Sequence, residues 1–347
     1  MAAAAKEGED WFRRQKELKG WHQGALEGLH ALVLGAGGLG TTISMDLCRL
    51  GVRKITLVDY DVVDDHNLNR QILYHKAHVG KPKVDCAKEV LDASHNLRSE
   101  VVAVNTDAVK RWGDIVDITR GVYRAEGEEG TPAPADPVDI IFNSIDYGDA
   151  FDHAVSALCL RLDLPVILGG TEPWYGHTVS FFFQEQRSVA GSGPCFGCAH
   201  DSDSVKASDI ATVQPDKVLG LRDISHLPKD VYPDKGGSTT FSAGTCSHMM
   251  VSQMVQYLLR KRDFAAVVAQ AEADGTAPPP YSSEDASPHR VPPKNTVIFN
   301  MISFESQGWR TARSCGCLLC KDYHPEWEAK EPEAAPAEGA AEVKLED

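Results

Sequence analysis

Residues suited to phosphate chemistry begin with a glycine-rich run, Gly35-Ala-Gly37-Gly38-Leu-Gly40, which has the spacing G-x-G-x-x-G. An apolar run at 30–34 precedes it, and apolar positions with helical spacing follow it. Glycines in this context let phosphates approach backbone amides at a helix N-terminus. Asp59 ends the next apolar run, at the separation where a carboxylate accepts a hydrogen bond from a ribose hydroxyl. The pattern predicts a nucleotide site, with a tight turn that holds no ligand as the alternative.

The segment after this acid indicates which nucleotide is used. It contains Asp61, the run Asn67-Leu-Asn69-Arg70-Gln71, and then Lys83. Arginine and lysine beyond the second strand have no function in a dinucleotide site, whereas they suit the β- and γ-phosphates of ATP. Either cation taken alone is more typical of solvated surface charge. Together with the glycine run, the segment favours ATP over a nicotinamide dinucleotide.

Asp146 supplies a carboxylate after a later apolar run, 138–144. Ligands of open α/β sheets bind at the edge formed by the carboxyl ends of the strands, where Asp146 would lie. Carboxylate oxygens are ligands that Mg²⁺ prefers. We therefore expect Asp146 to hold Mg²⁺ against the phosphates.

Four of the nine cysteines form two C-x-x-C pairs that are far apart in the sequence, Cys195/Cys198 and Cys317/Cys320. Four thiolates at this spacing suit tetrahedral Zn²⁺, so we expect a closed structural zinc site. His200 and Cys315 are close enough in sequence to serve as substitute ligands. The alternative is a set of unrelated thiols.

Strands that alternate with helices must position these residues. The expected strands are 30–34, 54–59, 101–106, 138–144 and 165–168, and the helices between them end at Gly51 or span 82–95, 108–120 and 150–162. This order predicts an α/β fold, a Rossmann-like, doubly wound, mainly parallel sheet. A possible antiparallel run at 178–184, a long helix at 239–261 and a strand-like run at 295–304 predict a C-terminal antiparallel extension.

Composition divides the chain into three parts. Residues 1–28 are expected to form an N-terminal helical segment, 29–322 one α/β domain, and 323–347 an acidic tail expected to be disordered. The domain carries inserts at about 124–137 and 270–294, and a polar segment at about 201–237 expected to be mobile. The net charge of −15 lies mainly in the tail and inserts, so it does not argue strongly against a nucleic-acid partner.

The segments GAGGLG, VDYDVVDDHNLNRQ, VGKPK, the Asp146 region and both C-x-x-C pairs resemble the ThiF/MoeB-type adenylating enzymes, which include the activating enzymes of ubiquitin-like proteins. The FRRQ at 12–15 matches as well, and Arg14 resembles the N-terminal arginine that reaches into a neighbouring subunit's ATP site. The resemblance covers about 11–322. It implies a homodimer that uses Mg·ATP to adenylate a carboxylate and releases pyrophosphate. The usual substrate is a ubiquitin-like or sulfur-carrier protein ending in Gly-Gly. The family usually has Asp-Asn where this chain has Asp146-Tyr147.

Adenylation needs phosphate charge to be neutralised, and no general base is required because the attacking carboxylate is already ionised. Arg14, Arg70 and Lys83 are assigned to the phosphates, with Asp61, Asn67, Asn69 and Gln71 as neighbours in the nucleotide site. Some relatives use a further cysteine as a thioester. Residues 201–242 contain no cysteine, and Cys246, the best candidate, fits a buried thiol better.

Other functions stay open at this point. A tRNA dehydratase of the same family would need no thioester cysteine, and a catalytically silent structural or regulatory relative would keep only the fold and the dimer. A nicotinamide oxidoreductase leaves NLNRQ unexplained. No apolar run reaches the ~18 residues of a membrane span, and the N-terminus lacks a secretory pattern. We therefore expect a cytoplasmic protein without a membrane partner.

Overall fold

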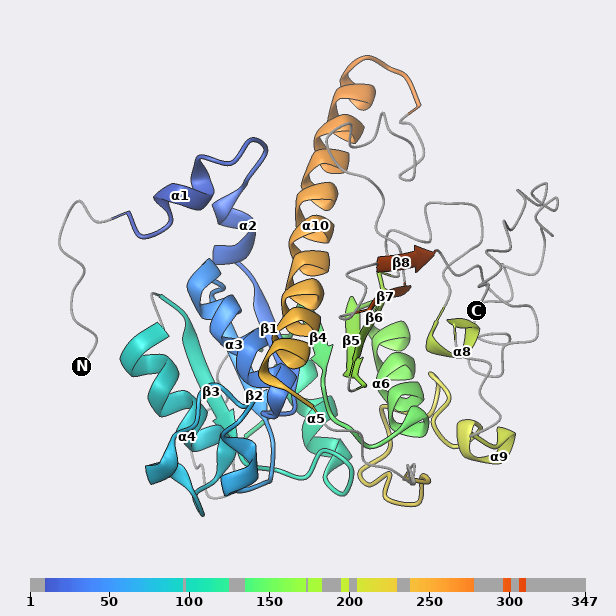
Figure 1. The fold of residues 1–347 in the computed structure, drawn as a ribbon. Coiled ribbons are helices and arrows are strands. Elements are labelled where there is room, and N and C mark those ends of the chain that lie inside the picture. The colour runs from blue at the N-terminus through green and yellow to red at the C-terminus, as the bar shows by residue number, and fades with distance from the viewer. Residues whose placement is uncertain are drawn as a thin grey trace, which may run out of the picture.

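The computed structural model describes residues 10–95, 98–124, 135–172, 174–182, 195–199, 205–229, 238–277, 296–300 and 306–309. Its centre is an eight-stranded sheet with the order β3-β2-β1-β4-β5-β6-β7-β8. Helices lie on both faces of this sheet (Figure 1). The arrangement confirms the predicted mainly parallel α/β fold.

The parallel half of the sheet consists of β1 (His30–Leu34), β2 (Lys54–Val58), β3 (Glu100–Val104), β4 (Ile140–Asn143) and β5 (Val166–Thr171). Every residue of β1 and β4 is buried, as expected for strands covered on both faces. The centre of β1 pairs with both neighbours, and Leu34 lies opposite Val58 and Asn143. The carboxyl ends of β1, β2 and β4 therefore share one edge of the sheet.

The remaining strands, β6 (Tyr175–Phe181), β7 (Thr296–Asn300) and β8 (Ser306–Trp309), pair antiparallel. The expected antiparallel extension is thus confirmed. β6 begins three residues earlier than the run that we expected, and β8 was not expected, because its sequence SQGW lacks an apolar run. A β5–β6 hairpin places Glu172 and Trp174 at the carboxyl edge of the parallel strands.

Helices divide between the two faces according to where their buried side chains pack. One face of the sheet carries a single hydrophobic cluster. The helices that contribute to it are α2 (Gln23–Glu27), α3 (Gly38–Leu50), α4 (Lys83–Val90) and α10 (Thr240–Ala273). The other cluster contains α5 (Trp112–Thr119), α6 (Asp149–Leu162), α8 (Phe196–Ala199) and α9 (Ala207–Ile210). The helix expected at 82–95 is α4 followed by a π-helical turn, η3 (Leu91–His95). Two short helices, α1 (Arg13–Lys16) and α2, lie in the described part of the N-terminal segment.

α10 extends twelve residues beyond the helix that we expected to end at 261. A capping box between Thr239 and Ser242 fixes its start. Residues 262–273 contain five alanines, and alanine has the highest helix propensity. The helix stops only before Gly275, whose φ is +64°. The insert expected from residue 270 therefore begins inside a helix, and α10 rises away from the sheet in Figure 1.

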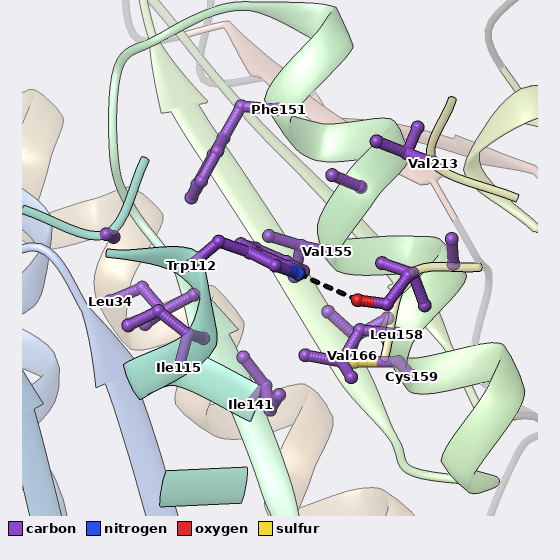
Figure 2. Close-up of a cluster of buried hydrophobic side chains, with 14 of the residues drawn as sticks. Leu34, Trp112, Ile115, Ile141, Phe151, Val155, Leu158, Cys159, Val166 and Val213 are labelled. Atoms are coloured by element: carbon purple, nitrogen blue, oxygen red, sulfur yellow. Dashed lines mark hydrogen bonds between the residues drawn. The ribbon is translucent and has the colours of Figure 1, made fainter. Parts of the chain in front are cut away.

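The segment 201–237 is packed where the structure describes it. Val205, Ile210, Val213, Val218, Ile224 and Leu227 are all buried against α5 and α6. The Trp112 indole donates a hydrogen bond to the Val218 carbonyl at 3.0 Å (Figure 2). The sequence predicted a mobile segment here from its few periodic positions. Residues 205–229 nevertheless bury these six apolar side chains, because the side chains follow loop geometry and have no helical or strand period. Among the described helices, none is both long and apolar enough to cross a bilayer.

Candidate nucleotide site

The glycine run forms a tight turn between β1 and α3, as predicted. Gly35 has φ +95°, a conformation that favours glycine. A Cβ on Gly40 would lie 1.8 Å from the Gly35 carbonyl oxygen, so only glycine lets α3 begin this close to the strand. Gly37 is the N-cap of α3, and the first backbone amide bonded within the turn is that of Thr41, to Gly37. The amides of residues 38–40 are thus the helix-end donors of the loop.

Two residues that the sequence analysis did not identify, Tyr74 and Ser144, donate hydrogen bonds to backbone carbonyls of this loop. Buried Tyr74 donates its hydroxyl to the Ala36 carbonyl at 2.8 Å. Burial raises the pKa of Tyr74, so the hydroxyl stays protonated. Ser144 donates to the Leu34 carbonyl at 2.8 Å and lies 3.3 Å from the Gly35 carbonyl. The only signal for Ser144 is its place directly after β4, and Tyr74 carries none because its contact is long-range.

The Asp59 carboxylate fastens the loop to the end of β2. One oxygen accepts from the Ala36 amide at 2.7 Å, and the other accepts from the Asp61 amide at 2.8 Å. Each carboxylate oxygen has a second lone pair, so a ribose hydroxyl can still be bound. The structure therefore places Asp59 beside the glycine loop and gives it a structural function as well.

Arg70 and Gln71 come to the same loop from the segment after β2. The Cγ of Arg70 lies 3.6 Å from where a Cβ on Gly38 would stand, and the guanidinium donates to the His66 carbonyl and to the Asn69 side chain, each at 2.9 Å. Gln71 is buried, and its amide nitrogen lies 4.0 Å from the corresponding position on Gly37. Its Oε1 atom has no hydrogen-bond partner among the residues that the structure describes. A buried amide with an unused acceptor beside a glycine loop fits a polar ligand such as a nucleotide.

Asn67 supports the turn that carries Arg70. Its side chain is 4% exposed, and its oxygen accepts from the Asp64 amide at 3.0 Å. This bond closes the capping box of η1 (Asp65–Asn67). The Asn67 side-chain oxygen, which was predicted to hydrogen-bond near the phosphates, therefore stabilises the turn instead.

Lys83 and Asp61, both predicted for the site, pair with each other. The ammonium lies 2.8 Å from Asp61 Oδ2, and the lysine side chain is 7% exposed. The Lys83 amide also donates to the Asp61 carbonyl. A phosphate would meet an ammonium that is held in place and already shared with a carboxylate.

Asp146 is exposed and lies three residues after Asn143, which pairs with Leu34 of β1. This register puts it at the same edge as the glycine loop. The next residue, Tyr147, packs against Phe151 with ring centroids 6.0 Å apart, and the Lys229 ammonium lies 5.5 Å from the Tyr147 centroid. The carboxylate expected for Mg²⁺ thus faces solvent while the atypical Tyr147 is turned into the fold.

Arg14 is the predicted site residue that the structure does not bring to the loop. It lies in α1, where Gln15 donates to the Leu50 carbonyl at the far end of α3. The thirteen residues of α3 place that end ~20 Å from the loop at 1.5 Å per residue. Arg14 itself is 94% exposed and 3.4 Å from Glu17. Within one copy it cannot reach the site.

The cysteine predictions are tested in part. Cys195 and Cys198 have their sulfurs 3.8 Å apart, whereas Cys317, Cys320, Cys315 and His200 lie outside the described residues. Among the described residues, no group of three or more histidine, cysteine or acidic side chains is placed to hold a metal. Cys246 is buried, 3.3 Å from the His177 carbonyl, and burial raises its pKa to about 12. This supports the buried-thiol interpretation over a thioester role.

Comparison with known proteins gives consistent matches. The chain is 31% identical over 169 residues to SUMO-activating enzyme subunit 2 of Dictyostelium discoideum, covering 48% of this chain and 21% of that protein. It is 28% identical over 190 residues to the molybdopterin-synthase adenylyltransferase of Escherichia coli K12, covering 54% and 66%. Less than two thirds of either relative is therefore spanned.

A solved structure of E. coli MccB with MccA-N7isoASN has the same fold, with a TM-score of 0.60, 16% sequence identity, and coverage of 91% of this chain and 76% of that one. Residues 12–279 match the ThiF family. The matched span contains the glycine loop, the segment after β2 and Asp146, and on this ground the chain belongs to the ThiF family.

Proposed function

We propose that this protein uses ATP to adenylate a carboxylate, the C-terminal glycine of a ubiquitin-like or sulfur-carrier protein, and releases pyrophosphate. The names of the two relatives, an activating enzyme for SUMO and an adenylyltransferase, support this activity class. The observation that carries the proposal is the convergence of Arg70 and Gln71 on the glycine loop, with Asp146 at the same sheet edge.

In the proposed reaction, a carboxylate oxygen of the substrate attacks the α-phosphorus of ATP. The new O–P bond forms as the bond to the β-phosphate oxygen breaks, and pyrophosphate leaves with that electron pair. The amides at the start of α3 bind the α-phosphate, and Arg70 neutralises charge on the leaving group. Lys83 contributes when its ammonium is shared between Asp61 and a phosphate. Asp59 and Gln71 orient the nucleoside and the loop.

Asp146 is an exposed oxygen ligand at this edge, which fits a hard cation, and Mg²⁺ bound there would offset phosphate charge. The separation of Arg14 from its own loop supports a homodimer in which each Arg14 serves the site of the other copy.

Isotope exchange between pyrophosphate and ATP tests the function directly. Wild-type protein is incubated with mature SUMO and other ubiquitin-like proteins ending in Gly-Gly, and separately with tRNA. We expect protein-dependent exchange, reduced about a hundredfold or more in Asp146→Ala and unchanged in Asp274→Ala, which removes a carboxylate at the distant end of α10. Exchange that survives in Asp146→Ala contradicts the mechanism. Exchange with tRNA alone selects the dehydratase alternative.

We also propose the zinc site for Cys195, Cys198, Cys317 and Cys320. The 3.8 Å separation of the first two sulfurs is the spacing of ligands around one tetrahedral ion. Metal analysis of the purified protein is expected to give one zinc per chain, lost together with thermal stability in Cys195→Ser. A zinc content near zero in the wild-type protein would contradict the four-cysteine zinc site.

A further inference from the structure

Two large aromatic side chains outside the described site are half exposed and stacked on each other. Trp174 in the β5–β6 hairpin is 50% exposed, and Phe241 in the first turn of α10 is 49% exposed. Their ring centroids are 6.5 Å apart, with an angle of 29° between the planes. Exposed aromatic pairs of this kind are common anchors in binding surfaces. We call Trp174 and Phe241 the aromatic pair.

The aromatic pair lies at the edge of the sheet that carries the nucleotide site. Trp174 follows the carboxyl end of β5, and β5 is parallel to β4, whose end leads to Asp146. The Thr171 and Ser238 hydroxyls, 3.4 Å apart, join the hairpin to the residue just before α10. Figure 1 shows α10 starting beside α3, and Ser247 of α10 donates to the Leu39 carbonyl at 3.1 Å. The pair is thus built on elements that also support the glycine loop.

The charge around the pair favours a peptide over a nucleic acid. Segments 171–175 and 238–244 contain one charged residue, Glu172, and it is acidic and exposed. Binding of a phosphate backbone needs clustered lysine or arginine, which these segments lack. Arg70 is the nearest cation shown, since its Cγ and the Cβ of Ala243 both lie within 3.6 Å of the Cβ position on Gly38. Two aromatic rings with one carboxylate in their own segments suit an extended polypeptide that presents apolar or basic side chains.

The distance along the edge fixes which part of a peptide would reach the pair. β5 is two strands from β1, which is about 10 Å at the usual strand spacing. An extended chain advances about 3.3 Å per residue. When the terminal carboxylate is at the α-phosphate, the residue about three positions before it stands beside Trp174 and Phe241.

We propose that the aromatic pair binds the extended C-terminal segment of the protein substrate and contacts the side chain about three residues before the adenylated carboxylate. This rests on the proposed adenylation function. It assigns to Trp174 and Phe241 a part in substrate affinity and not in the chemical step.

The test measures pyrophosphate exchange in the full chain as a function of carrier concentration, with mature SUMO first and the panel of Gly-Gly proteins after it. We expect the KM for the carrier to rise about tenfold in Trp174→Ala and in Phe241→Ala, with kcat and the KM for ATP nearly unchanged. Trp174→Phe keeps an aromatic ring and should retain most of the affinity. Val122→Ala is the matched control, because Val122 is equally exposed at 50% but lies beside Gly121 and Asp136, at the opposite edge of the sheet.

The outcomes separate this proposal from the function on which it rests. If the wild type is active and the KM for the carrier is unchanged in both alanine variants, the proposed role of the aromatic pair is wrong, while the proposed adenylation function is unaffected. If either alanine variant also binds ATP more weakly, the aromatic pair supports the structure of the nucleotide site, and the proposed role in carrier binding is contradicted. Exchange that requires tRNA, or no exchange with any carrier, removes the proposed function and this inference with it.

Discussion

At the scale of single residues, the proposed nucleotide site is built from groups that also support the fold. Asp59 holds two backbone amides, and Lys83 is paired with Asp61. Gln71 is different, because its buried oxygen has no partner in the described structure. An unpartnered buried acceptor costs free energy, and a ligand that satisfies it recovers that cost. The Gln71 oxygen is therefore an acceptor that the proposed nucleotide could satisfy.

A second ionic cluster lies at the opposite edge of the sheet, away from the site. The Asp136 carboxylate accepts from Arg53 at 2.7 Å and from Lys54 at 3.0 Å, and it lies beside His30. Hydrogen bonds from Arg53, and then those from Lys54, hold the pKa of Asp136 well below its usual range. The cluster ties residues 135–138 to the starts of β1 and β2.

This cluster predicts a pH-dependent stability. Because the pKa is lower in the folded protein, the stabilisation is complete above the unfolded value of about 3.9 and is lost as pH falls through the folded value. The free energy of unfolding of Asp136→Asn, from urea titration, should be lower than that of wild type at pH 7, and the gap should narrow towards pH 3. Asp274→Asn controls for the loss of one charge. A gap that stays constant with pH would exclude the ionic explanation.

At the scale of elements, the contact between β1 and α3 determines where the phosphate donors point. The Gly35 carbonyl and the start of α3 are so close that Gly40 leaves no room for a side chain. The register of β1 with β4 then sets Ser144 against the same turn and carries Asp146 to the same edge. These contacts therefore define the shape of the loop without a ligand.

Gly40→Ala should disrupt both stability and nucleotide binding. Its Cβ would stand 1.8 Å from backbone atoms that cannot move aside, so we expect a loss of about 3 kcal/mol in the free energy of unfolding. Gly244→Ala is the matched control, because Gly244 lies within α10 and a Cβ there meets no atom of another described segment within 4 Å. That change should stabilise α10 by about 0.5–1 kcal/mol. Urea titration and ATP calorimetry measure both effects, and a Gly40→Ala protein with normal ATP affinity would contradict the model of the loop.

At the scale of the whole molecule, α3 separates the glycine loop from Arg14, both of which belong to the proposed active site. The glycine loop is at one end, and Arg14 is attached to the other through Gln15 and Leu50. A single chain cannot bring them together, because an α-helix of this length is a stiff spacer. If Arg14 contributes to catalysis, a second copy must supply it.

Subunit complementation tests this arrangement. Arg14→Ala and Asp146→Ala should each be nearly inactive in pyrophosphate exchange. When the two variants are mixed and allowed to exchange subunits, half of the dimers contain one intact site, so about a quarter of wild-type activity should return in a symmetric dimer. Sedimentation would confirm the dimer. An Arg14→Ala protein that is fully active, or a mixture that stays inactive although it forms mixed dimers, would exclude the shared site.

Much of the fold follows from local sequence. The apolar runs before Gly35, Asp59 and Asp146 became β1, β2 and β4, because buried parallel strands need continuous apolar residues. The spacing of Gly35, Gly37 and Gly40 similarly determines the strand–turn–helix unit. Local pattern failed at β8 and at the packed residues 205–229, whose order comes from neighbours distant in sequence.

The sequence by itself determined the residue types available for phosphate chemistry and the elements that carry them, since period and turn chemistry are properties of adjacent residues. Only the tertiary structure decided which of these residues meet. It placed Tyr74 under Ala36, paired Lys83 with Asp61, buried Cys246, and set Arg14 at the far end of α3. Contacts of this kind depend on strand register and on how helices pack across the sheet, and no local pattern encodes them.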